Sequence, residues 1–149
     1  MKTLTWPIKT VARVADVNSR ILDQWFRTGM LRYSSDDKHS MGTGVRSGMT
    51  RPRVIEATIV RLLGRYGVPT SRAGRAVQEF TMNGNNGRRA ACELFPLGKT
   101  VLIIGQNDAV VSNVDFDANI FDLSNNGVAL VVDLNAIVAK VDFELSKSK

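Results

Sequence analysis

The stretch Ile8–Leu31, IKTVARVADVNSRILDQWFRTGML, decides the fold of the N-terminal part of this chain. Its small and apolar residues have the spacing of two short helices that pack across a tight turn. In the first half Val11 and Val14 can point inward together, and Ala12 is small enough to let a second helix cross close by. We expect the turn at residues 16–18, so the segment predicts a helix-turn-helix.

The second of these helices is expected to begin at a side-chain cap and to end at a glycine. Asn18 or Ser19 can supply the capping oxygen, and Gly29 is a typical C-terminal stop. One face of the helix is apolar and carries Ile21, Leu22 and Trp25. The other face carries Ser19, Arg20, Asp23, Gln24 and Arg27. This hydrogen-bonding and basic set suits contact with base edges and phosphates in the major groove of DNA, although a solvated face of a plain helical bundle has a similar composition.

Two more helices are expected after a polar stretch. Thr50 suits an N-cap and Pro52 suits the first helical turn, so a helix is predicted from Pro52 to Tyr66. Its apolar residues recur at helical spacing, with three arginines on the other faces. The apolar set is Val54, Ile55, Ile59, Leu62 and Leu63, and the arginines are Arg53, Arg61 and Arg65. The sequence Gly67-Val68-Pro69 ends this helix, and Thr70 or Ser71 can cap the next.

Residues 6–80 resemble the winged-helix DNA-binding domain of the MerR family and of the related excisionase-like proteins. The residues that carry the resemblance are Trp6, Ile8, Val11-Ala12, Val17, Ser19-Arg20, Leu22, Trp25, Gly29-Met30-Leu31, the Gly44 to Thr50 wing return, the Pro52 to Tyr66 helix and Gly67 to Ser71. The resemblance implies that the second helix enters the major groove and that the wing touches the flanking backbone. It places Ser19, Arg20, Gln24 and Arg27 on the groove side, and Lys38, Arg46 and Arg51 against phosphate.

The charge of the chain is divided unevenly along its length. The net charge is +6 over 149 residues, but residues 1–99 hold 17 Lys and Arg against 7 Asp and Glu, and residues 100–149 hold 3 against 7. The first part is therefore at +10 and the second at −4. A basic half that contains the predicted helix-turn-helix is the pattern expected when that half meets phosphates.

The residues needed for an enzyme or a metal centre are scarce. His39 is the only histidine and Cys92 the only cysteine, which disfavours a nucleophile-histidine site, a disulfide or a multi-cysteine metal cluster. Asp115, Asp117, Asp122 and Asp133 lack the spacing of a calcium loop. We expect no catalytic activity, no cofactor and no metal. No apolar run approaches the roughly 18 residues needed to span a bilayer, so a cytoplasmic protein without a membrane partner is expected.

The C-terminal part changes from helical to strand-like patterns. Thr100–Ile104 and Ala109–Ser112 flank a turn and predict a hairpin. A second strand pair is predicted from Val128–Val132 and Ala139–Leu145, joined by a turn or short helix that Asp133 could cap. The predicted class is α+β: a winged helix-turn-helix in residues 1–80, a linker with a short helix in 81–99, and a small α+β part with two strand pairs in 100–149.

These features predict a sequence-specific protein for double-stranded DNA, acting in transcription regulation as a homodimer held by residues 100–149. An excisionase-like or phage packaging protein would use the same domain to bend or mark DNA. A protein-interaction module is the third reading. The sequence leaves a small-molecule effector open.

Overall fold

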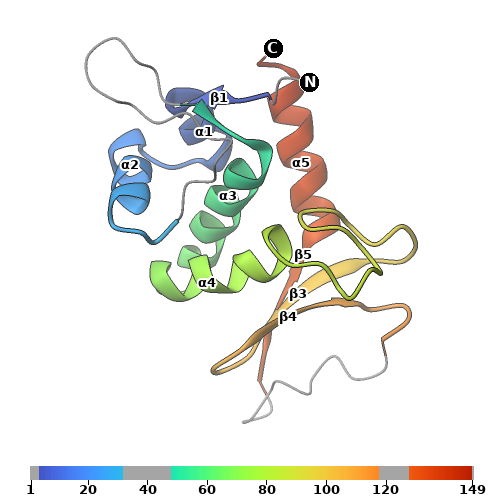
Figure 1. Cartoon of the computed structure of the whole chain (residues 1–149). Helices are drawn as coiled ribbons and strands as arrows, with labels where there is room; N and C mark the ends of the chain where they lie inside the picture. The colour runs from blue at the N-terminus through green and yellow to red at the C-terminus, as the bar shows by residue number, and fades with distance from the viewer. Residues whose placement is uncertain (1–3, 32–47, 118–127, 149) are drawn as a thin grey trace. The chain divides into compact units, whose positions relative to one another are not determined.

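The computed structural model describes residues 4–31, 48–117 and 128–148 (Figure 1). Within these ranges the chain is a mixed α+β protein with five helices and two small antiparallel sheets, which confirms the predicted class. The chain divides into two compact units: an N-terminal unit of residues 1–74 with 141–149, and a sheet unit of residues 75–140. The C-terminal end thus belongs with the N-terminal unit, whereas the sequence pattern grouped it with the strands.

The first two helices are joined by a tight turn, as the sequence predicts. Helix α1 spans Ile8–Ala15 and α2 spans Ser19–Arg27. Asp16 ends α1 in the left-handed conformation, with φ 56° and ψ 50°, and the N–H of Val17 donates to the carbonyl of Ala12 over 3.0 Å. This arrangement satisfies the last carbonyls of α1 while it reverses the chain. The side chain of Asn18 then caps α2 by accepting from the N–H of Arg20 over 2.8 Å.

The buried face of α2 differs from the expected one, because it includes Phe26 and leaves out Ile21. Leu22, Trp25 and Phe26 are buried, a set with the i, i+3, i+4 spacing of one helical face. Ile21, which was expected to point inward, is 45% exposed. Ile21 lies at one edge of the apolar side of α2, about 100° around the helix from Leu22, and the elements packed against α2 do not cover that edge.

A two-residue ladder and a longer helix complete the frame of the N-terminal unit. Strand β1, Trp6–Pro7, pairs antiparallel with β2, Gly48–Met49. Helix α3, Arg51–Arg65, begins after Thr50 as predicted, and α4 spans Thr70–Thr81. Arg53 was expected on an outer face but is buried, 2.9 Å from the buried carboxylate of Glu56. Pairing lets both charges leave water.

Helix α4 comes very close to the chain that follows α2. A Cβ placed on Gly74 would lie 2.4 Å from the carbonyl oxygen of Met30. No side chain larger than hydrogen fits at such a distance, so glycine is required for this approach. Leu31, next to Met30, is fully buried and donates its N–H to the carbonyl of Trp25 over 3.0 Å.

The sheet unit is built on three antiparallel strands in the order β4-β3-β5. The predicted hairpin is confirmed: β3, Thr100–Ile104, pairs with β4, Ala109–Asn113, in a register that sets Leu102 opposite Val111. Strand β5, Leu130–Asp133, pairs with the other edge of β3. The second predicted pair is therefore wrong, because β5 takes β3 as its partner.

The residues predicted as the last strand form a helix instead. Helix α5 runs over Leu134–Ser146, and Asp133 caps it by accepting from the N–H of Ala136 over 3.1 Å. Its buried residues are Leu134, Val138, Val141 and Leu145, a series at steps of four, three and four. Phe143, which the alternation placed inward, is 60% exposed. The helical period over the whole segment prevails over the short alternation from 141 to 145.

The segment between α4 and β3 consists of turns and contains no helix in residues 82–99, although a short helix was expected there. Its centre is the buried Arg89, whose guanidinium donates to the carbonyls of Glu79 at 3.0 Å and Phe80 at 3.1 Å, at the end of α4. Asn85 accepts from the Nε of Arg89 over 2.6 Å. One arginine thus satisfies several polar groups and fixes the loop.

Candidate nucleic-acid interface

The outer face of α2 carries the side chains that the sequence predicted for DNA contact. Arg20, Gln24 and Arg27 are exposed and Ser19 is partly exposed. Residues 20, 24 and 27 follow one another at steps of four and three, so they lie on one helical face opposite Leu22 and Phe26. The structure therefore gathers the four predicted groove residues on one short helix.

The two arginines of this face differ in their electrostatic surroundings. The Nε of Arg27 lies 2.6 Å from the carboxylate of Asp23, one turn earlier. Within the described part of the chain, no carboxylate lies within ion-pairing distance of Arg20. Asp23 offsets the charge of Arg27, whereas no acidic side chain of the described residues offsets the charge of Arg20.

The turn before α2 is held from behind by helix α3. The Nε of Arg61 donates to the backbone carbonyl of Asp16 over 2.9 Å, and the guanidinium of Arg65 reaches the Asp16 carboxylate at 2.5 Å. Asp16 is the residue of the turn with a left-handed backbone, so α3 binds the chain at the position where its direction reverses. These contacts fix the direction in which α2 leaves the turn.

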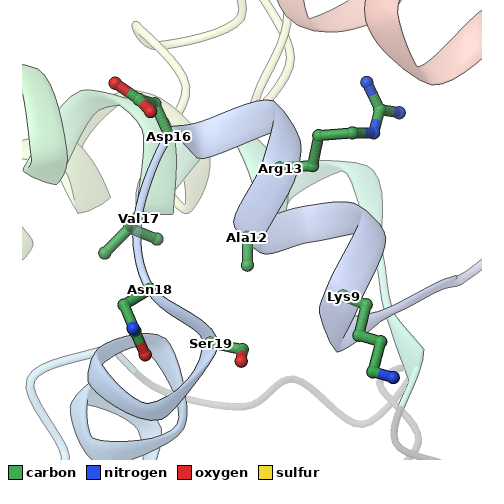
Figure 2. A pocket seen from close by; sticks show the side chains of 7 residues that line it. All are labelled: Lys9, Ala12, Arg13, Asp16, Val17, Asn18 and Ser19. Carbon is green, nitrogen blue, oxygen red and sulfur yellow. The ribbon is translucent and has the colours of Figure 1, made fainter.

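An open groove of about 540 Å³ runs between α1 and the start of α2 (Figure 2). Ala12 points toward the start of α2 in this view, with Lys9 and Arg13 on one side and Asp16 on the other. Lys9 and Arg13 share a face of α1 because they are four residues apart. Val17, Asn18 and Ser19 complete the lining.

The positive charge of Arg13 is partly neutralised by the C-terminal end of the chain. Its guanidinium lies 3.2 Å from the carboxylate of Glu144 and donates to the hydroxyl of Ser148 over 2.5 Å. Lys9 has no carboxylate within ion-pairing distance in the described ranges. Among the described residues, Lys9 in the groove and Arg20 on the helix face thus have no acidic side chain that offsets their charge.

Arg51, which the resemblance placed against phosphate, is bound by an acidic side chain of its own unit. Its Nε donates to one oxygen of Asp142 over 2.7 Å and its Nη2 to the other over 3.0 Å. A phosphate would have to compete with this two-pronged ion pair. Lys38 and Arg46 lie outside the described residues, so their predicted phosphate contacts stay predictions.

Among the described residues of the sheet unit, Arg89 and Asp117 have shifted pKa values. Burial lowers the pKa of the Arg89 guanidinium. The N–H of Asn113 donates to the Asp117 carboxylate over 2.7 Å and, together with Arg88, holds its pKa below the usual range.

Among the described residues no cluster of His, Cys, Asp and Glu is suited to a metal ion. No helix in those ranges is long and apolar enough to cross a membrane.

Sequence reasoning missed two residues at this surface. Lys9 gave a weak signal, because it precedes Arg13 by one helical turn on the outer side of the first predicted helix. Ile21 gave no signal, because an isoleucine beside Leu22 is typical of a core.

No protein-family model matches the chain, and comparison with curated protein sequences finds no significant similarity.

Proposed function

We propose that this protein binds double-stranded DNA sequence-specifically, with α2 in the major groove, and that it acts as a dimeric transcriptional regulator. The observation that carries the proposal is the outer face of α2, where Arg20, Gln24 and Arg27 are exposed on one side of a helix that is fixed on the other. Arginine pairs with guanine and glutamine with adenine through two hydrogen bonds each. The face therefore offers both base readout and phosphate contact.

The rigidity of α2 supports this function. The helix is anchored by the Asn18 cap, by the left-handed Asp16 with its two arginine contacts from α3, and by its buried apolar face. A side chain on a fixed helix loses less conformational freedom on binding than one on a loop. A fixed helix also presents its base contacts at constant spacing, which sequence specificity requires.

The charge distribution and the sheet support a dimer. The basic charge is concentrated in residues 1–99, and residues 100–149 are acidic and have little use for DNA. Within the described residues β4 and β5 are both edge strands, which offer unpaired backbone groups to a second copy of the chain. Two copies related by a twofold axis would place their helices on half-sites about 10 base pairs apart, or a multiple of this.

Binding-site selection with the full-length chain and a random duplex library tests the proposal. A recovered inverted repeat supports it, and footprinting on genomic DNA distinguishes a promoter operator from clustered sites at an attachment or packaging locus. In anisotropy titrations on the selected duplex, Arg20→Ala or Gln24→Ala should weaken specific binding by about 1–3 kcal/mol and relax the preference at one base. Lys140→Ala removes one positive charge from the sheet unit and should leave the base preference unchanged.

Three outcomes would contradict the proposal. If the α2 variants bind like the parent, α2 does not read the groove. If light scattering shows a monomer at the concentrations where the DNA is saturated, the dimer is wrong. Failure to recover any duplex from the library would refute specific DNA binding altogether.

A further inference from the structure

Ile21 is the exception among the apolar residues of α2. Leu22, Trp25 and Phe26 are buried, and they suffice to pack the helix against its unit, whereas Ile21 is 45% exposed. It directly follows Arg20 and precedes Gln24 by one helical turn. An apolar side chain is thus placed at the border of the exposed polar face.

The stability of the helix gives no reason for an isoleucine at this position. A β-branched side chain has a lower helix propensity than alanine, glutamate or lysine, and its exposed methyl groups remain in water. A single exposed apolar residue is common on protein surfaces. The position of Ile21 among hydrogen-bonding side chains in the N-terminal half of α2 is what singles it out, because that half of such a helix contacts base edges.

We propose that Ile21 is a specificity-determining residue that packs against the C5-methyl group of a thymine in the major groove. This inference rests on the proposed function. The thymine methyl is the apolar group that base pairs present in that groove, and apolar side chains recognise it by contact. Gln24, one turn later, has the amide that pairs with adenine, so the two side chains together would read adjacent A·T pairs.

Replacing thymine by deoxyuracil tests the inference, because uracil lacks the methyl group and keeps every hydrogen-bonding group. The probe is the duplex selected from the random library, with each thymine replaced in turn. At one position the parent protein should bind about fourfold more weakly, the factor that corresponds to roughly 0.8 kcal/mol for one methyl-sized group returned to water. Ile21→Ala should bind the thymine duplex more weakly by at least that factor and should not distinguish thymine from uracil there.

Matched controls separate this effect from a general loss of structure. Val128→Ala removes a β-branched side chain that is 76% exposed and lies outside β4 and β5, and this variant should keep the full uracil effect. Ile21→Ala should unfold at the parent's temperature or slightly above it, because little buried surface is lost and alanine favours the helix. Ile21→Val should retain part of the discrimination.

The outcomes distinguish this inference from the proposed function. If Gln24→Ala weakens binding but no uracil replacement does so for the parent, the thymine contact is wrong and DNA reading by α2 stands. The same conclusion follows if Ile21→Ala remains as sensitive to uracil as the parent. If the library yields no duplex for the parent, the proposed function and the thymine contact both fail.

Discussion

Gly74→Ala should destabilise the N-terminal unit, although alanine is the better helix former. The added Cβ would lie 2.4 Å from the carbonyl oxygen of Met30 and 3.5 Å from its carbon. Ordinary contact begins near 3.4 Å, so α4 or the chain after α2 must retreat by about 1 Å. The opposing atom belongs to the backbone and cannot turn aside as a side chain could.

The magnitude follows from two opposing contributions. Overpacking of this kind costs about 1–3 kcal/mol, and the rigid partner favours the upper end. The gain in helix propensity from glycine to alanine is about 0.5–1 kcal/mol. The net loss is therefore about 2 kcal/mol, which corresponds to a fall in melting temperature of roughly 4–8 °C for a chain of this size.

Gly64→Ala is the matched control, because Gly64 also lies in a helix and no atom would come within 4 Å of its added Cβ. This variant should gain the propensity term alone and melt roughly 1–4 °C above the parent. The assay is thermal unfolding of the full chain followed by circular dichroism. Equal shifts of the two variants, in either direction, would show that α4 does not approach the Met30 carbonyl.

Three further predictions concern the buried Arg89 and the carboxylates of Asp117 and Asp142. Arg89→Met removes the hydrogen-bond donors of several backbone carbonyls and should lower the free energy of unfolding, measured in urea, by about 3 kcal/mol or more. The control Arg88→Met changes an exposed side chain and should lower it by less than about 1 kcal/mol. Similar losses for the two variants would contradict the role of Arg89. The pKa of Asp117 is lowered in the folded chain, so its ionised carboxylate stabilises the fold above the ordinary aspartate pKa of about 3.9. This stabilisation is lost as the pH falls through the lowered pKa of the folded state. Melting temperatures measured below about pH 4 should thus fall more steeply for the parent than for Asp117→Asn, and parallel curves would exclude this linkage. Asp142→Asn removes the charge that pairs with Arg51 and should lower the free energy of unfolding by less than about 1 kcal/mol. The affinity for any DNA duplex should rise, and its salt dependence should steepen by about one unit. An unchanged affinity would show that Arg51 does not contact DNA.

The short-range features of the fold were predictable because their causes lie within a few residues. The Asn18 cap acts on an N–H two positions ahead, and the β3-β4 hairpin follows from two β-branched runs around a turn. Asp133 capping α5 is another local contact. The alternation at 141–145 taken alone predicts a strand, whereas the burial of Leu134 and Val138 extends a helical period through the same residues.

The candidate site was predictable only as a set of residue types on one helical face. That Arg20, Gln24 and Arg27 share a side of α2 follows from the helical period, which the sequence contains. That Ile21 lies outside the core does not follow, because the width of a buried face depends on the partners that pack against it. In α2 those partners cover three apolar side chains and leave the fourth exposed.

The sequence by itself determined the α+β class, the turn between the first two helices, the hairpin and the polar face of α2. Tertiary structure alone decided which charges are compensated, since Arg51 meets Asp142 across 91 positions and Arg13 meets Glu144 across 131. It also decided that Gly74 touches the Met30 carbonyl. Caps, turns and periods depend on neighbours along the chain, whereas these contacts depend on the path of the whole backbone, which no local pattern specifies.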